Sequence, residues 1–570
     1  MSNAPSSVLS GAVTSEQLRA SEIGTSILSS GGNAADAIIA TVLAINTLAP
    51  YHSDIGGGGF AIVRTKDGDH DVLDFRHTAP ASATSEFYRD EHISTSVGGA
   101  AVAVPGELRG LEELHHRYGR LPWAKLFEPS IKLAENGFEV RPDLYEFLIG
   151  DYSWTSLDPA YGSLYGHDGR PIPMGSTWRR PEYANTLRKV AEEGTGAFYG
   201  GEIAESIVNV VQERGGFMSL DDLKNYRVKW RKPLSTQYRQ YTLWAPPAPA
   251  SGAIWLSAMG MLSRFEAEGR GSVADLHRLT EALRLAYGQR TALGDPAFVP
   301  GLDEAQTSWL NPSAIDERAR LIDDKTTHPP DYYKPAKVEI VEDHGTSNIT
   351  AADSDGLVVS ITTTVGLGWG SRIIVPGYGF VLNDSMDDFS VEGRPNGTGY
   401  EPQVANFVFG RKRPLSSSCP YIIELTSTGQ PILSGGAAGG STIISANTQV
   451  ARNVLDYNMT PFEALRERRL HNQILPDHSI FELPGVYSGV TVEGFEEDSE
   501  TVKGLREKGH QIEWTKRNRS VPVALGIQRE EPEESSNLSS ANGPQSAPTW
   551  KWDPQAEPRR VDSGGSVFIA

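Results

Sequence analysis

The chain has almost no cysteine: Cys419 is the single one among 570 residues. A lone cysteine excludes an intrachain disulfide and any cysteine-rich zinc or iron–sulfur site. Long apolar runs are also missing, since no segment approaches the ~18 uninterrupted apolar residues of a membrane-spanning helix. Residues 1–13 have neither the basic start nor the apolar core of a signal peptide. From these absences we expect a soluble, cytoplasmic protein.

Positive charge is scarce as well, because 52 lysines and arginines face 72 acidic residues and the net charge is −20. No basic run offsets this excess, which argues against a nucleic-acid partner. The glycine run at 56–59 is not followed by the Gly-Lys-Ser/Thr of a Walker loop. His115 and His116 are adjacent, without the i,i+4 spacing of helical metal ligands. We therefore expect neither a metal nor a cofactor.

What the sequence does contain is a change of pattern beyond its middle. Residues 15–49 have helical periodicity, and residues 273–295 give the clearest amphipathic helix. Residues 328–345 are polar and punctuated by proline, which predicts an exposed tether. Beyond Thr346 strand patterns predominate, with hairpin turns at Asp-Gly and Thr-Gly steps. Residues 529–548 are acidic and rich in Ser and Pro, which predicts a mobile insertion.

Thr346 follows Gly345 where the tether meets the first of these strands. Most threonines in strands are only β-formers, and a threonine hydroxyl is a weak nucleophile unless a base lies beside it. If the chain cuts itself between Gly345 and Thr346, the new α-amine has a pKa near ~8 and can accept the hydroxyl proton. Thr346 would then supply both nucleophile and base.

A nucleophile of this kind needs backbone N–H groups aimed at the developing oxyanion. Gly439 and Gly440, in "GGAAGGST", stand where a strand pattern ends and a helix pattern begins. Helix N-termini attract negative charge, although a glycine-rich bend is by itself usually only a bend. Beside a candidate nucleophile, the two glycines become a candidate oxyanion hole.

The order of these motifs resembles the γ-glutamyltransferase (glutathione hydrolase) family of N-terminal nucleophile hydrolases. The matching blocks run along almost the whole chain: "GGNAADAIIATVLAINTLAP", "IGGGGF", "VAVPGELRGLEELHHRYGRLPW", "GAFYGGEIAESIV", "LNDSMDDFS", "RPLSSSCP", "GGAAGGS" and "PRRVDSGGSVFIA". The resemblance implies an α+β fold, a four-layer αββα sandwich. It also implies a precursor that cleaves itself into a large subunit, residues 1–345, and a small catalytic subunit, residues 346–570, which stay together.

The resemblance also implies roles for individual residues. Thr346 matches the nucleophile, and Thr364 matches a second threonine that assists processing and hydrogen-bonds the new amine. Gly439 and Gly440 match the oxyanion-hole pair. The cleavage site is then the bond between Gly345 and Thr346.

The resemblance implies two clamps for the γ-glutamyl donor, of which the first is intact. Arg76 matches the arginine that grips the donor α-carboxylate, a task that suits a guanidinium because it can form two parallel hydrogen bonds. Ser416 and Ser417 match the serine pair that helps to hold the same carboxylate.

The second clamp, for the donor α-amine, is altered. Asp388 matches the family's aspartate, but Gly366 stands where the family usually has asparagine and Ser385 where it has glutamate or glutamine. Each lost hydrogen bond to a charged group can cost about 1.5–3 kcal/mol. His77 stands where the family often has glutamate, either as a surface change or as part of the pocket. These departures indicate relaxed or altered substrate choice.

Three functions remain open at this stage. The first is removal or transfer of the γ-glutamyl group of glutathione or of glutathione conjugates, including conjugates of a specialised pathway, to water or to an amino-acid or peptide acceptor. The second is an amidase or acylase of the same fold that acts on a different acid. The third is a binding protein with a dead site.

Overall fold

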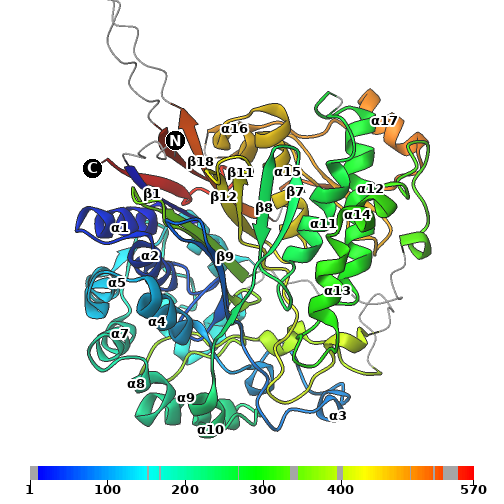
Figure 1. Ribbon diagram of the computed structural model, residues 1–570. Coiled ribbons are helices and arrows are strands. Elements are labelled where there is room, and N and C mark those ends of the chain that lie inside the picture. The colour runs from blue at the N-terminus through cyan, green and yellow to red at the C-terminus, as the bar shows by residue number, and fades with distance from the viewer. Residues whose placement is uncertain are drawn as a thin grey trace, which may run out of the picture.

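The computed structural model describes residues 10–150, 153–165, 168–267, 269–333, 345–393, 402–487, 489–517, 520–529 and 550–569. Two antiparallel sheets lie face to face, and each is covered on its outer side by helices (Figure 1). The strand order is β20-β1-β9-β10-β2-β3-β6 in the first sheet and β19-β18-β12-β11-β8-β7 in the second. The predicted αββα sandwich is confirmed.

The strands of the first sheet are β1 (Ser10–Ser15), β2 (Gly58–Arg64), β3 (His70–Phe75), β6 (Lys229–Arg231), β9 (Gly345–Ala352), β10 (Val358–Gly366) and β20 (Gly564–Ile569). Those of the second are β7 (Leu234–Tyr238), β8 (Tyr241–Ala245), β11 (Tyr421–Leu425), β12 (Pro431–Ala438), β18 (Val521–Arg529) and β19 (Trp550–Ala556). Short strands outside the two sheets are β4 (Phe138–Glu139), β5 (Thr177–Trp178), β13 (Leu470–His471), β14 (Ser479–Glu482), β15 (Gly485–Tyr487), β16 (Val490–Val492) and β17 (Ile512–Thr515).

The helices on the side of the first sheet are α1 (Leu18–Ser29), α2 (Ala34–Leu48), α4 (Glu107–Tyr118), α5 (Trp123–Asn136), α6 (Pro142–Ile149), α7 (Pro181–Glu193), α8 (Gly196–Tyr199), α9 (Gly201–Glu213) and α10 (Leu220–Asn225). Those on the side of the second sheet are α11 (Gly252–Leu262), α12 (Val273–Arg290), α13 (Leu302–Trp309), α14 (Pro312–Ala319), α15 (Thr442–Tyr457), α16 (Pro461–Arg466) and α17 (Glu500–Glu507). The short α3 (Ser85–Tyr88) lies at one end. Among the described residues, no helix combines the length and apolar character that a membrane crossing requires.

The N-terminal helical prediction for residues 15–49 is partly wrong. Residues 10–15 form β1, which pairs with β9 and β20 inside the first sheet and brings the two ends of the chain together (Figure 1). The helical part is broken at Gly31, which has a φ of +90°, and α2 restarts with a capping box between Asn33 and Asp36. The sequence did not reveal β1, because this strand is only six residues long and shows no alternation, being buried on both faces.

The strand predictions beyond Thr346 are mostly confirmed. The Asp355–Gly356 step joins β9 to β10, and the Thr428–Gly429 step joins β11 to β12. In contrast, residues 371–384, where the strand pattern beyond Thr346 continues, form only isolated bridges, such as Ile374 with Val381. Most of the predicted tether, 334–344, and nearly all of the predicted insertion, 530–548, lie outside the described residues.

The interface between the sheets sets the direction of β12 relative to β9. Ser360 Oγ in β10 donates to the carbonyl oxygen of Gly435 at 2.9 Å, and Ser360 is paired with Thr350 of β9. One residue further along β12, a Cβ on Gly436 would lie 2.3 Å from Asn348 Nδ2. Residues nearer the end of β12 therefore face residues nearer the start of β9.

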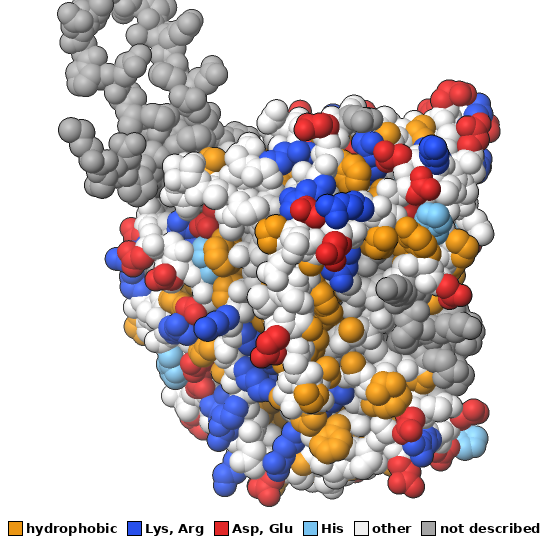
Figure 2. Space-filling model, turned by 45° about the vertical axis from the view of Figure 1, so that its right-hand side comes forward, with side chains coloured by type: hydrophobic (Ala, Val, Ile, Leu, Met, Phe, Trp, Pro, Cys, Tyr) orange, Lys and Arg blue, Asp and Glu red, His pale blue; other side chains and the backbone are white. Residues whose placement is uncertain are grey.

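The surface fits the absence of a basic run in the sequence. On the face drawn in Figure 2, acidic and basic side chains are interspersed, and the described residues form no broad basic area there. The exposed apolar side chains on this face form several small groups.

Candidate active site

Thr346 and Thr364 lie opposite each other on β9 and β10, and both are buried. Thr346 Oγ1 donates to Thr364 Oγ1 at 3.1 Å, and Thr364 Oγ1 donates to the carbonyl oxygen of Gly345. The Thr364 hydroxyl also accepts the N–H of Gly366 at 2.9 Å. A hydroxyl has one donor and two acceptor positions, so these three contacts use all of them. The threonine pair thus forms a directed chain of hydrogen bonds that ends on the Gly345 carbonyl.

A glycine separates this pair from the predicted carboxylate-binding arginine. β2 pairs with β10 so that Gly58 lies opposite Thr364, and β3 pairs with β2 and ends at Phe75, directly before Arg76. A Cβ on Gly58 would lie 2.6 Å from the carbonyl oxygen of Phe75, so a side chain does not fit there. Thr346, Thr364, Gly58 and Arg76 therefore follow one another across four adjacent strands.

Gly439 and Gly440 connect β12 to α15, as the sequence predicts. Their φ values are +119° and +59°, in the region that favours glycine. The N–H of Thr442 contacts the carbonyl oxygen of Gly439 at 3.2 Å, so the first turn of α15 begins here. Because β12 approaches the start of β9 toward its own end, this helix N-terminus lies at the same end of the interface as Thr346.

Arg76 and Asp388 are in direct contact. The Arg76 side chain is fully buried, and its Nη2 donates to Asp388 Oδ2, the last residue of the 3₁₀ turn η5 (Ser385–Asp388). Arg76 also contacts the carbonyl oxygens of Pro414 and Leu415 at 3.5 and 3.4 Å. Burial raises the pKa of the Asp388 carboxyl, and the Arg76 guanidinium opposes that rise. The residues expected to bind the donor carboxylate and the donor ammonium thus form an ion pair.

Ser416 and Ser417 directly follow the segment that Arg76 contacts. Ser416 Oγ donates to Ser418 Oγ at 2.9 Å, whereas Ser417 Oγ accepts a hydrogen bond from Arg290 Nη2 at 2.9 Å. Arg290 is the last residue of α12 and is buried. The structure therefore places Arg76 against the segment that directly precedes both predicted serines, and places a second arginine against Ser417.

The two altered positions of the amine clamp have structural explanations. Gly366 has a φ of +99°, and a Cβ there would lie 1.8 Å from Asp384 Oδ1, which accepts the N–H of Leu367 at 2.9 Å. An asparagine at 366 is therefore incompatible with Asp384 in this position. Ser385 Oγ forms a hydrogen bond with Nδ1 of His77 at 3.1 Å.

His77 is not a surface change, because it lies buried beside Arg76 and Ser385. Its side chain is fully buried, and its Nδ1 lies 3.3 Å from Arg76 Nη1. Burial, followed by the charges of Arg76 and Arg413, lowers the pKa of His77 well below its usual value. A neutral imidazole and a hydroxyl thus occupy positions where the family has acidic or amide side chains.

Buried carboxylates support the threonine pair from the opposite face of the sheet. Ser347 and Thr363 are paired across β9 and β10, one position along from Thr346 and Thr364. Ser347 Oγ donates to Glu16, and Thr363 Oγ1 donates to Glu107 Oε2 at 2.6 Å. Burial is the main cause that raises the pKa of Glu107 to about 8. These contacts fix the register that places the reactive hydroxyls opposite each other.

Replacing Glu107 with Gln is expected to change how stability depends on pH. The folded state keeps Glu107 protonated up to pH about 8, while the unfolded chain ionises it from pH about 4.5. The folded state therefore binds the extra proton in this window, and stability falls as pH rises, by up to ~1.4 kcal/mol per pH unit. Glu107→Gln should remove this slope, which urea unfolding at pH 5.5 and pH 8 would measure. Glu113→Gln, a half-buried position on the same helix, is the control; equal slopes in all three proteins would contradict the expectation.

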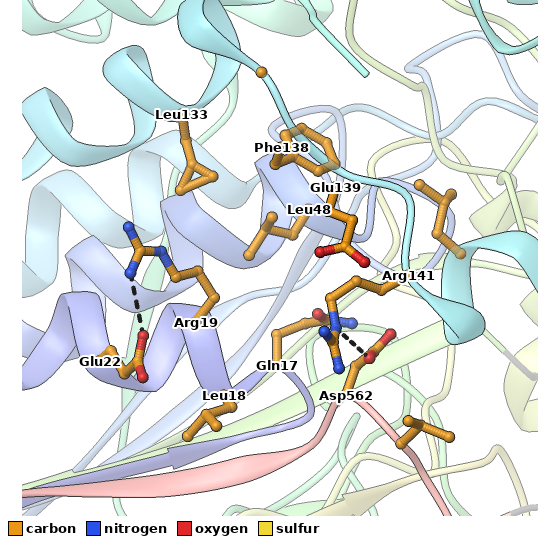
Figure 3. A pocket seen from close by; sticks show the side chains of 13 residues that line it. Gln17, Leu18, Arg19, Glu22, Leu48, Leu133, Phe138, Glu139, Arg141 and Asp562 are labelled. Carbon is orange, nitrogen blue, oxygen red and sulfur yellow. Dashed lines mark hydrogen bonds and ion pairs between the residues drawn. The ribbon is translucent and has the colours of Figure 1, made fainter. Parts of the chain in front are cut away.

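A separate cavity of about 470 Å³ lies on the outer side, beside α1 and the end of α5 (Figure 3). None of the predicted site residues lines it. Its arginines are paired with acidic neighbours, Arg19 with Glu22 at 3.2 Å and Arg141 with Asp562 at 2.6 Å. We assign it no part in the chemistry.

His277, Glu281 and His510 form, within the described chain, a buried group whose possible metal-binding atoms lie within 4.8 Å of one another. Protein groups already engage these atoms. His277 Nδ1 and His510 Nε2 are 2.7 Å apart, and Glu281 accepts hydrogen bonds from Thr327 and Tyr333 at 2.6 Å each. Burial and His277 lower the pKa of His510 to about 3. The group is best explained as a hydrogen-bonded network that fastens residues 327–333 to α12.

Arg290 and Glu107 were not predicted from the sequence to lie at the site. Arg290 lies in a helix pattern whose charged residues are normally expected in solvent, but fifteen of the eighteen residues of α12 are buried. Glu107 stands at the first position of α4, where an acidic residue is ordinary helix chemistry. The only available signal was position: Glu107 lies inside a family-like block, and Arg290 ends the most regular helix.

Comparison with known proteins agrees with the motifs. The profile of the gamma-glutamyltranspeptidase family matches residues 20–550. The glutathione hydrolase proenzyme of Arthroderma benhamiae is 40% identical over 488 residues, which cover 83% of each chain.

Two solved structures agree with the fold. The cephalosporin acylase of Bacillus halodurans matches at a TM-score of 0.79 and 25% identity, covering 100% of this chain and 97% of its own. The gamma-glutamyltranspeptidase of Helicobacter pylori matches at a TM-score of 0.54 and 29% identity, covering 59% of this chain and 97% of its own. The αββα sandwich described above is the N-terminal nucleophile hydrolase fold. By sequence and by fold, the chain belongs to the gamma-glutamyltranspeptidase family.

Proposed function

We propose that this protein is a self-processing γ-glutamyltransferase and glutathione hydrolase with Thr346 as its nucleophile. The observation that carries the proposal is the hydrogen-bond chain from Thr346 through Thr364 to the Gly345 carbonyl, in line with a buried arginine two strands further on. The chain's relatives are named glutathione hydrolases, which supports glutathione and its conjugates as donors.

Self-cleavage begins with attack of Thr346 Oγ1 on the carbonyl carbon of Gly345. The Thr346 proton passes to Thr364 Oγ1, and the Thr364 proton passes to the carbonyl oxygen. The former carbonyl oxygen is therefore protonated and carries no negative charge. The C–N bond then breaks, the amine takes a proton, and an ester joins Gly345 to Thr346 Oγ1. Water hydrolyses this ester and leaves Thr346 with a free α-amine.

The freed amine then serves as the base for each catalytic cycle. It accepts the Thr346 hydroxyl proton while Oγ1 attacks the γ-amide of the donor, and the protonated amine returns a proton to the leaving amine. The N–H groups of Gly439 and Gly440 stabilise the oxyanion at the N-terminus of α15. Water or an amino-acid amine then attacks the glutamyl ester, which gives hydrolysis or transfer.

The sheet topology explains why the two subunits, residues 1–345 and 346–570, remain together after cleavage. In the first sheet β1 lies between β20 and β9, and β10 pairs with β2, so strands from the two sides of the cleavage site pair with each other at three places. In the second sheet β8 pairs with β11. Separation would break the backbone hydrogen bonds of these strand pairs and expose both interfaces to water.

The test of this function combines protein chemistry with two substrates. Intact mass and N-terminal sequencing of the purified protein should give a fragment that starts at Thr346. The same preparation should hydrolyse a γ-glutamyl anilide faster than the anilide of glutaric acid, which lacks the α-amine. A chain that remains uncut after prolonged incubation, or a cut chain without γ-glutamyl turnover, would contradict the proposal.

Replacing Ser385 with Glu is expected to sharpen selection for the donor α-amine. Ser385 hydrogen-bonds His77 and begins the turn that ends at Asp388, so a carboxylate there adds negative charge beside the aspartate. A charged hydrogen bond regained to the donor ammonium should raise the ratio of γ-glutamyl to glutaryl turnover about 10-fold or more. Steady-state kinetics with the two anilides would measure it. Ser385→Ala is the control and should leave the ratio close to that of the wild type; a Glu variant with an unchanged ratio would argue against an amine site here.

A further inference from the structure

Arg290 is a buried cation without a carboxylate of its own. It lies at the C-terminal end of α12 and is 4% exposed. Within the described residues it forms no ion pair, and its Nε has no hydrogen-bond partner. Tyr287 and Asp388 are the two groups whose charge acts on Arg290, and only Asp388 is a carboxylate, which is already bound to Arg76. Two buried guanidinium groups thus share one buried carboxylate.

An excess of buried positive charge is costly unless a ligand supplies the missing anion. The helix end offers part of the compensation, since a cation at a C-terminus is favourable by about 0.3–1 kcal/mol. That is small beside the cost of an unpaired buried charge. The position of the excess, next to the serines that follow the Arg76-contacting segment, points to the donor carboxylate as the missing anion.

The hydrogen bond from Arg290 also decides which serine can bind the donor. A guanidinium only donates, so Ser417 Oγ must accept from Arg290 Nη2. The Ser417 proton is then directed away from Arg290, and within the described chain it has no acceptor. Ser416 differs, because its hydroxyl donates to Ser418 Oγ at 2.9 Å. Ser417 is therefore the serine whose O–H is left for a carboxylate.

We propose that Arg290 is a positioning residue of the donor pocket, which orients the Ser417 hydroxyl toward the donor carboxylate and supplies the positive charge that balances it. This inference rests on the proposed function, because it assigns a donor carboxylate to the pocket. It adds a third element to the carboxylate clamp, contributed by α12, a helix that carries none of the site residues predicted from sequence. The clamp then joins three separate parts of the chain: the end of β3, the end of α12 and the segment at 414–417.

The test measures donor kinetics for Arg290→Gln, Arg290→Lys, Ser417→Ala and the double variant Arg290→Gln/Ser417→Ala. Arg290→Gln should raise KM for a γ-glutamyl anilide about 10- to 100-fold, with kcat changed less than about 3-fold and self-cleavage complete. Arg290→Lys, which keeps the charge, should recover at least half of this loss on a logarithmic scale. The double variant should lose clearly less than the product of the two single losses, because the part of the Arg290 effect that acts through the Ser417 hydroxyl is already absent in Ser417→Ala.

A binding measurement separates this inference from the proposed function. Calorimetry should show that L-glutamate binds the wild type at least about 10-fold more tightly than isoglutamine, in which the α-carboxylate is an amide, and that Arg290→Gln reduces this difference. If glutamate binding depends on Arg290 but the protein shows no γ-glutamyl turnover, the proposed function is wrong and the role of Arg290 in carboxylate binding stands. Turnover with a KM unaffected by Arg290→Gln, or multiplied effects in the double variant, would overturn the inference alone. Absence of both turnover and glutamate binding would overturn both.

Discussion

Thr346→Ala is expected to remain a single uncut chain and to lose γ-glutamyl turnover by at least ~10³-fold. Alanine has no hydroxyl to attack the Gly345 carbonyl, so neither the ester nor the free α-amine can form. Self-cleavage and catalysis are therefore both lost. Thr346 is the nucleophile in self-cleavage, and in catalysis its hydroxyl is the nucleophile and its α-amine the base. Intact mass after prolonged incubation, followed by an anilide assay, would measure both effects.

Thr346→Ser is the matched control, since it keeps the hydroxyl and loses only the methyl group. It should still cleave itself and turn over donor, more slowly than the wild type because the β-branched side chain of threonine restricts the rotamer of the hydroxyl. The carboxylate pocket should be unaffected in both variants, and both should keep the wild-type unfolding midpoint before processing. Cleavage at the same bond in Thr346→Ala would mean that another group attacks Gly345, and the mechanism proposed here would be wrong.

Arg76→Gln is expected to lower kcat/KM for a γ-glutamyl anilide by about 10²- to 10³-fold, because two charged hydrogen bonds to the donor carboxylate are lost. It should also destabilise the fold. The side chain is fully buried against Asp388, and removing one partner of a buried pair leaves the other charge uncompensated, at a cost of about 3–5 kcal/mol. Steady-state kinetics and urea unfolding would measure the two losses separately.

The double variant Arg76→Gln/Asp388→Asn distinguishes binding from stability. It removes both charges, so much of the lost stability should return while donor binding stays weak. Self-cleavage should proceed in both variants, since neither side chain takes part in the Thr346–Thr364–Gly345 hydrogen-bond chain. If activity returned together with stability in the double variant, Arg76 would be a structural residue and not part of a carboxylate clamp.

The sequence alone was enough to predict the fold class and the family, and it named candidates for the site. Thr346 and Gly345 could be found because self-cleavage needs a small residue and a hydroxyl at a boundary between two patterns. Gly439 and Gly440 could be found because a glycine pair between a strand and a helix is a local feature. Arg76, Asp388, Ser416 and Ser417 depended on resemblance, since nothing in their own neighbourhoods marks them as partners.

The tertiary structure decided how these residues meet. Strand register, which depends on pairing between segments far apart in the chain, puts Thr364 between Thr346 on one side and Gly58 on the other. Burial, which depends on packing from all sides, lowers the pKa of His77 and raises the pKa of Glu107 to about 8. The ion pair of Arg76 with Asp388 and the contact of Arg290 with Ser417 join residues 312 and 127 positions apart. Local patterns carry no information about such pairs, because the chain between them can be rearranged without changing either residue's own surroundings in sequence.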